Sequence, residues 1–166
     1  PQILVVSPGS IAQKPQTESF ITYYDIFVRN AFGNYFDILK EVTYSPMMSE
    51  MLSYLNGKST GYEYIRSKRL QYADENFARE VMQLFSIGLN ALNNDGTLQL
   101  DGDGNPIRSY TNNDITEYAK VYTGFRRQRT RGNIEDRTSP TGSDNQVDPM
   151  QIRADHSDHL PKVCGS

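Results

Sequence analysis

The two histidines of the chain stand close together near its C-terminus, among acidic residues. His156 and His159 are three residues apart, and Asp155 and Asp158 lie beside and between them. On a helix, this spacing places both imidazoles on one face, as zinc and iron sites require. Pro161 argues against a helix that continues here, so an exposed segment with chance clustering is the competing interpretation. The candidate metal ligands are His156, Asp158 and His159.

Glu80 is a second candidate for chemistry, because it is a carboxylate on the apolar side of an expected helix. At roughly 100° per residue it projects between Leu84 and Ile87, at the border of the apolar arc. A carboxylate there is at least partly buried, and a buried charge requires a partner. Either it accepts hydrogen bonds and locks helix packing, or it acts as a general base or metal ligand. In the second case it would join the histidine cluster around a divalent metal, provided that the C-terminal segment folds back.

A run of arginines forms the densest charge feature of the chain and consists of Arg126, Arg127, Arg129 and Arg131. Guanidinium groups bind phosphate, sulfate or acidic sugars through paired hydrogen bonds, and they equally meet acidic protein surfaces. A solvated loop is the alternative interpretation. The formal net charge of -3 argues against nucleic acid as the partner, since no global field attracts it.

Other catalytic and membrane classes find no support in the sequence. There is no nucleophile elbow and no glycine loop of the kind that binds phosphate. The single cysteine, Cys164, cannot form an internal disulfide. No apolar run approaches the ~20 residues that cross a bilayer, so the sequence predicts no transmembrane segment.

Length and patterning predict one mainly α domain, an irregular helical bundle. The chain has 166 residues, of which 37% are apolar, which suffices for a single core. Apolar residues recur three or four apart over 18–31 and 35–42, and a third helix is expected to begin at Ser45, followed by Pro46. We expect residues 57–70 to form a polar connection.

A central helix is expected over residues 74–90. The aspartate at its first position is a good N-cap, and Gly88 or Asn90 can adopt the left-handed conformation that ends a helix. Its polar face pairs Glu75 with Arg79, four residues apart. The expected apolar side consists of Phe77, Ala78, Val81, Met82, Leu84, Phe85, Ile87, Gly88 and Leu89.

A small β-hairpin and a further helix are expected after the central helix. Alternating residues on both sides of a glycine-rich turn predict the hairpin over 97–108. Thr111 and Asp114 have the spacing of a capping box for a helix over 112–125. The buried stripe of that helix is expected to consist of Ile115, Tyr118, Ala119, Tyr122 and Phe125.

The composition changes after residue 125. Residues 126–149 have no apolar periodicity and are rich in Arg, Ser, Thr, Gly, Asp and Asn. The expected organisation is therefore a helical part, residues 1–125, followed by an arginine-rich loop and a polar C-terminal tail, residues 126–166.

Two motifs carry a family resemblance. The central helix reads Tyr72-Ala73-Asp74-Glu75-Asn76-Phe77-Ala78-Arg79-Glu80, with Gln83-Leu84-Phe85-Ser86-Ile87-Gly88 after it. The second motif runs from Tyr110-Thr111-Asn112-Asn113-Asp114-Ile115 to Thr123-Gly124-Phe125. Together with Phe32-Gly33-Asn34, Leu39 and Ser45-Pro46-Met47-Met48, these motifs resemble the family called domain of unknown function 1800, in the right order over nearly the whole chain.

The resemblance implies a mostly helical fold and export to the cell surface, the exterior or an organelle lumen, but no reaction. It also implies that this chain is an internal fragment of a longer domain. The family has a later His-Asp motif followed by lysine, which Asp158 and Lys162 match. Ser157 stands where that histidine is expected, which puts any role of the histidine in doubt.

Two functional hypotheses follow. The first is a structural or interaction module, an accessory part of an exported or multi-subunit assembly, whose partner is another protein or the missing parts of its own domain. The second is a metal-assisted hydrolase that uses Glu80 with His156, Asp158 and His159. No other cofactor is expected.

Overall fold

The structure is a computed structural model that describes residues 3–7, 17–129 and 145–162. Within these ranges the chain is mainly helical, as expected, with one small antiparallel sheet. The elements are α1 (Thr17–Arg29), α2 (Tyr35–Tyr44), α3 (Pro46–Met51), α4 (Thr60–Ser67), α5 (Asn76–Glu80), α6 (Asn112–Ala119), β1 (Phe125–Arg126) and β2 (Gln151–Ile152). A π-helical turn, Val81–Phe85, extends α5, and 3₁₀ turns occupy Lys120–Tyr122 and Ala154–His156.

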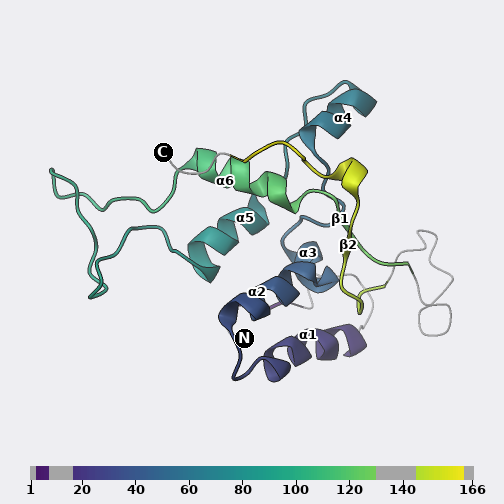
Figure 1. The fold of residues 1–166 in the computed structure, drawn as a ribbon, viewed down its shortest axis with the longest axis horizontal. Coiled ribbons are helices and arrows are strands. Elements are labelled where there is room, and N and C mark those ends of the chain that lie inside the picture. Colours follow the sequence, from purple (N-terminus) through teal and green to yellow (C-terminus); the bar gives the residue numbers. More distant parts are fainter. Residues whose placement is uncertain (1–2, 8–16, 130–144, 163–166) are drawn as a thin grey trace.

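The helices pack in two groups that meet around an aromatic core (Figure 1). The first group contains α1, α2 and α3, and the second pairs α5 with α6. Where they meet, the Tyr54 ring stacks on Phe77 with centroids 4.3 Å apart, and Tyr122 meets Phe77 edge-on at 4.7 Å. The buried apolar residues include Tyr23, Ile26, Phe27, Val42, Met47, Met48, Tyr54, Phe77, Ala78, Val81, Phe85, Ile115, Ala119, Tyr122, Phe125 and Met150.

Helix starts follow the local capping signals of the sequence. The Ser45 side chain accepts from Met47 N at the start of α3, with proline as the first helical residue. At α6, Thr111 accepts from Asp114 N, and the Asp114 carboxylate accepts from Thr111 N at 2.8 Å. The predicted capping box is thereby confirmed.

Replacing Thr111 with alanine should lower the free energy of unfolding by about 1 kcal/mol, because the Asp114 amide loses its acceptor in the first turn of α6. Urea denaturation followed by circular dichroism measures this change. Thr22→Ala, inside α1, is the control and should change stability by less than about 0.5 kcal/mol. Equal effects at the two positions would contradict the role of the capping box.

The central helix is shorter than the expected span of 74–90 and changes its winding halfway. Regular α-helix covers Asn76–Glu80, and the turn that follows is π-helical. Ser86 Oγ donates to the Val81 carbonyl at 2.6 Å, and Tyr35 Oη donates to the Phe85 carbonyl at 2.6 Å. Both hydroxyls satisfy carbonyls at the end of the helix, where intrahelical partners run out.

The π-helical turn changes which side chains face the core. Phe77, Ala78, Val81 and Phe85 are buried as predicted. The prediction for Leu84, Ile87 and Leu89 was wrong, since all three are exposed. The prediction assumed a constant 100° per residue, whereas a π-turn closes i→i+5 hydrogen bonds and advances less per residue. Gly88 has φ +76° and lies just beyond the helix end, as expected.

Residues 57–70, expected to be a polar connection, contain α4. The Ser59 side chain accepts from Tyr62 N and caps the helix. The helix ends at Lys68, which has φ +58° in the left-handed region. No residue of α4 is buried, so the helix is not held by a packed face of its own.

Residues 89–109 form a β arm that extends away from the helices (Figure 1). Leu100 bridges Pro106, which confirms the hairpin expected over 97–108. A second turn, after Asn93, brings Leu92 opposite Leu98. The arm is therefore longer than the predicted hairpin and includes the segment directly after the central helix.

The chain after residue 125 contributes to the core where it is described. Phe125 pairs with Ile152 in the antiparallel β1–β2 sheet. Met150 is buried, and its amide donates to the Tyr44 carbonyl at 2.7 Å. Residues 145–162 thus pack against the helical part. In the described ranges, no helix is long and apolar enough to cross a bilayer.

Candidate functional site

Three distant segments of the chain meet at Gly124, in the second motif. Gly124 N donates to the Gly57 carbonyl at 2.7 Å, and Asn56 N donates to the Phe125 carbonyl at 2.8 Å. From the other side, Arg153 N donates to the Gly124 carbonyl at 2.8 Å. We call this junction of residues 56–59, 123–126 and 153–158 the Gly124 corner.

Only glycine fits at the centre of this corner. Its φ of +89° lies in the left-handed region, and a Cβ placed there would be 2.1 Å from Ser157 Oγ and 2.8 Å from the Arg153 carbonyl oxygen. Ser157 Oγ in turn lies 3.0 Å from the Arg153 carbonyl oxygen and 3.2 Å from that of Thr123. Ser157, the position at which the family resemblance led us to expect a histidine, therefore packs directly against Gly124.

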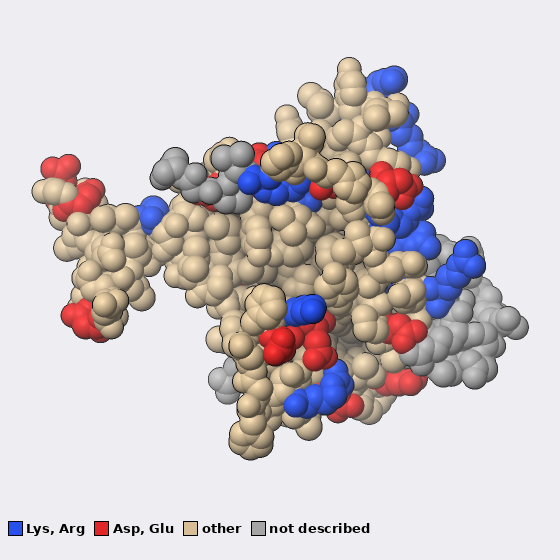
Figure 2. All heavy atoms as spheres, in the orientation of Figure 1, with Lys and Arg blue, Asp and Glu red and all other residues tan. Residues whose placement is uncertain are grey.

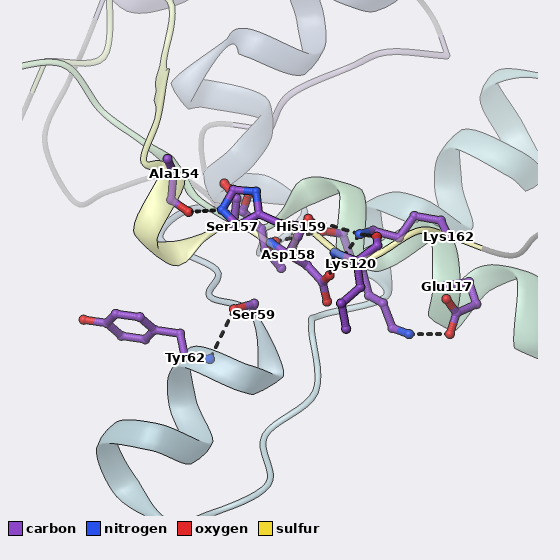
Figure 3. Close-up of polar contacts among 11 residues, drawn as sticks. Ser59, Tyr62, Glu117, Lys120, Ala154, Ser157, Asp158, His159 and Lys162 are labelled. Carbon is purple, nitrogen blue, oxygen red and sulfur yellow. Dashed lines mark hydrogen bonds and ion pairs between the residues drawn. The ribbon is translucent and has the colours of Figure 1, made fainter.

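Thr123 connects the end of α6 to the C-terminal segment. Its Oγ1 donates to the Lys120 carbonyl at 2.8 Å and accepts from Asp158 N at 2.8 Å. The Asp158 carboxylate accepts from Lys162 Nζ at 3.0 Å (Figure 3). Burial alone would raise the pKa of Asp158, but the hydrogen bonds from Lys162 and the Leu160 amide hold it below its usual value. Asp158 is therefore an ionised, bonded carboxylate at neutral pH.

The two histidines contact different partners. The His156 ring lies against the Tyr62 ring with centroids 4.4 Å apart. His159 Nε2 instead lies 2.6 Å from the Ala154 carbonyl oxygen, as Figure 3 shows. In the ranges that the structure describes, no three His, Cys, Asp or Glu side chains are grouped so that they could hold a metal ion. The metal site of His156, Asp158 and His159 stays a prediction, and no contact of the described residues favours it.

Stability should fall as the pH drops through about 6.5, the usual pKa of histidine, because folding holds His156 neutral. Burial lowers the pKa of His156, and the charge of Arg153 lowers it further, while Asp155 acts in the opposite direction. The unfolded chain therefore binds this proton more readily than the folded one. Urea denaturation across this pH range should show a shallower pH dependence in His156→Gln, and identical dependence in both proteins would contradict the assignment.

Glu80 lies half-buried on α5 and takes part in none of the hydrogen bonds that form the Gly124 corner. Among the described residues, the Glu80 side chain has no hydrogen-bond or ion-pair partner. Other acidic residues of the first motif, Asp74 and Glu75, form the contacts that hold the start of α5 and join it to α6. Asp74 Oδ1 accepts from Asn76 N at 2.8 Å, and Thr116 Oγ1 donates to Glu75 at 2.7 Å, which joins α6 to the start of α5.

The expected pair of Glu75 and Arg79 is present, with the two charged groups 3.0 Å apart. Both side chains are more than one-third exposed, so water screens the pair. Tyr110, in the second motif, packs partly buried against the core. These contacts give the motif residues structural roles.

The arginine run is divided between two roles. Arg127 Nη2 pairs with Glu50 Oε2 at 2.7 Å, largely buried, and so ties the chain after β1 to α3. Arg126 and Arg129 line a groove of about 850 Å³. Arg131 lies outside the described residues. Of the three arginines that the structure describes, two therefore remain for an anionic partner in this groove.

A second cavity, of about 570 Å³, lies between α1 and α2. None of the candidate residues from the sequence lines it. Its Glu41 accepts from Asn30 at 2.9 Å and pairs with Arg29. The hydrogen bond from Asn30, assisted by Arg29, holds the pKa of Glu41 below its usual value, so this carboxylate is charged and paired.

Comparison with known proteins identifies the family. The model of the family described as protein of unknown function (DUF1800) matches residues 5–164. The chain belongs to this family. No curated protein and no solved structure matches it.

In this DUF1800 chain, both motifs are parts of one framework. The first motif forms α5 and joins it to α6 through Glu75 and Thr116. The second motif caps α6 and ends at the Gly124 corner. Sequence patterns missed the Tyr62–His156 contact, because it joins residues that are far apart in the chain.

Proposed function

We propose that this DUF1800 chain is a structural or interaction module of a larger protein assembly and that it binds through the β arm, residues 89–109. The observation that carries this proposal is the exposure of the apolar side chains of the arm. Their exposed fractions are 53% for Leu92, 45% for Leu98, 54% for Leu100 and 41% for Ile107. Exposed apolar side chains on a projecting element are typical of interaction surfaces.

The backbone of the arm is already paired. Ala91 N donates to the Ile107 carbonyl, Ile107 N donates to the Gln99 carbonyl, and Gln99 N donates to the Ala91 carbonyl, each at 2.9 Å. Each of the three short segments therefore bonds to the other two. A partner that adds a strand would have to compete with these bonds, so contact through the side chains is the favoured mode.

The arm has no core of its own to keep it ordered. Short hairpins are marginally stable in water unless a further layer covers an apolar face. Turn hydrogen bonds supply part of the order, since Asp95 accepts from Thr97 N at 3.0 Å and Asp101 accepts from Asn105 N at 2.8 Å. A protein partner, or another segment of the same protein, would supply the missing cover.

The proposal is tested by the size of the assembly that contains the protein in its native source. The variant Leu92→Ser with Leu100→Ser should sediment as a smaller particle than the wild type. The matched control is Val28→Ser with Val121→Ser, which removes two equally exposed apolar side chains from helical segments. The control should sediment like the wild type. An arm variant that keeps the full assembly size would contradict the proposal.

A further inference from the structure

We propose that a second projecting element, α4 with the turn that follows it, docks on an anionic lipid surface. We call residues 64–72 the α4 tip. It lies apart from the β arm, and α4 projects from the body of the molecule on another side (Figure 1). The inference is independent of the function proposed for the arm.

Apolar and amphipathic side chains of the α4 tip face solvent. Ile65 is 74% exposed and Leu70 is 67% exposed, and the rings of Tyr64 and Tyr72 are also exposed. Aliphatic side chains beside tyrosines suit the boundary between lipid headgroups and acyl chains, where the phenol stays in contact with water.

The same short segment carries cations that no carboxylate neutralises. Arg66 donates to the Tyr62 hydroxyl at 3.1 Å, and Lys68 lies over the Tyr64 ring at 5.9 Å. Within the described ranges, Arg66, Lys68 and Arg69 form no ion pair. Lys58, which directly precedes the Ser59 cap of α4, is by contrast paired with Glu63. The positive charge of the tip is therefore left for an external anion.

The charges of the molecule are segregated in a way that orients it on such a surface. Lys and Arg side chains gather over α4 and along the adjoining edge, whereas the β arm carries acidic side chains at its far end (Figure 2). With a net charge of -3, the protein as a whole is repelled by an anionic bilayer. Attraction through the α4 tip would hold the acidic arm away from the lipid.

A lipid surface would contact more of the exposed side chains of the α4 tip than other anionic partners would. Nucleic acid or an acidic polysaccharide would use the cations and the tyrosine rings, but it would leave Ile65 and Leu70 in water. The acidic arm of a second copy is a weaker partner, because Asp95 and Asp101 already accept turn hydrogen bonds. Basic and aliphatic side chains together favour an anionic bilayer.

Co-sedimentation of the full chain with lipid vesicles tests the inference. We expect binding to vesicles of phosphatidylcholine mixed with phosphatidylserine, no binding to phosphatidylcholine alone, and weakening by added salt. Each Lys or Arg near an anionic surface strengthens binding about fivefold. Lys68→Gln with Arg69→Gln removes two such charges and should therefore reduce the vesicle partition coefficient on the order of 30-fold. Ile65→Ser with Leu70→Ser should reduce it about tenfold at constant charge.

The charge control is Lys40→Gln with Arg29→Gln, which changes the net charge equally at exposed positions outside the tip and the β arm. This control should bind the mixed vesicles like the wild type. An equal loss in the control, or no binding of the wild type to mixed vesicles, would overturn the inference. The inference would also be overturned if the wild type did not bind vesicles and the Lys68→Gln, Arg69→Gln variant changed its oligomeric state. That result would assign the α4 tip to a protein partner.

Discussion

Replacing Gly124 with alanine should destabilise the protein by more than about 4 kcal/mol or prevent folding, which is the largest effect expected of any small substitution here. The added methyl group would meet Ser157 Oγ at 2.1 Å and a backbone carbonyl at 2.8 Å, in a left-handed conformation that alanine adopts with strain. The three segments of the Gly124 corner would have to separate, and the β1–β2 pairing would be lost as well. Urea denaturation measures the loss.

Gly102→Ala is the matched control for Gly124→Ala. Gly102 has no heavy atom within 4 Å of the added Cβ and no positive φ, so its replacement should change stability by less than about 0.5 kcal/mol. A second variant, Gly124→Ala with Ser157→Gly, removes the closer clash and should recover part of the loss. Equal stability of the two single glycine variants would show that the corner is not closely packed.

Phe77→Ala should lower the free energy of unfolding by about 3–5 kcal/mol, the usual cost of a large cavity in an aromatic core. The Phe77 ring is fully buried between Tyr54 and Tyr122, with ring centroids 4.3 Å and 4.7 Å away. The remaining rings are large and rigid, so the site has little scope to collapse onto the space. Thermal and urea denaturation of the variant measure the effect.

Leu84→Ala serves as the control for Phe77→Ala and tests the π-helical turn. A regular helix over 74–90 would bury Leu84 on the same side as Phe77, whereas the structure leaves Leu84 55% exposed. Its replacement should therefore cost less than about 1 kcal/mol. A loss at Leu84 similar to that at Phe77 would indicate a regular helix in place of the π-turn.

The features that the sequence predicts well depend on nearby residues. The caps at Ser45 and Thr111 act within one helical turn, so residue type and spacing are sufficient to predict them. The turn at Asp101 is equally local, since its carboxylate bonds amides two and four residues ahead. Ile115 and Ala119 are buried in α6 as predicted, but the helix expected over 112–125 ends at Ala119 and continues only as the 3₁₀ turn Lys120–Tyr122.

The features that the sequence does not predict depend on distant contacts. The π-turn is supported by Tyr35, fifty residues earlier in the chain. α4 keeps its position through its contact with His156 and not through a buried face of its own. The close spacing of the two histidines says little about a shared site, because the backbone turns between them and sends each ring to a different partner. Local patterns contain no information about such contacts.

The central claim, that the β arm is the binding surface of this DUF1800 chain, is tested most directly by photo-crosslinking in the native source. A photoreactive amino acid is placed at Leu100 on the arm and, as the control, at Val28, which has similar exposure on α1. The account predicts a discrete covalent product from Leu100, either with another chain or with another segment of the same protein, and no such product from Val28. If Leu100 gives no more product than Val28, the claim is contradicted.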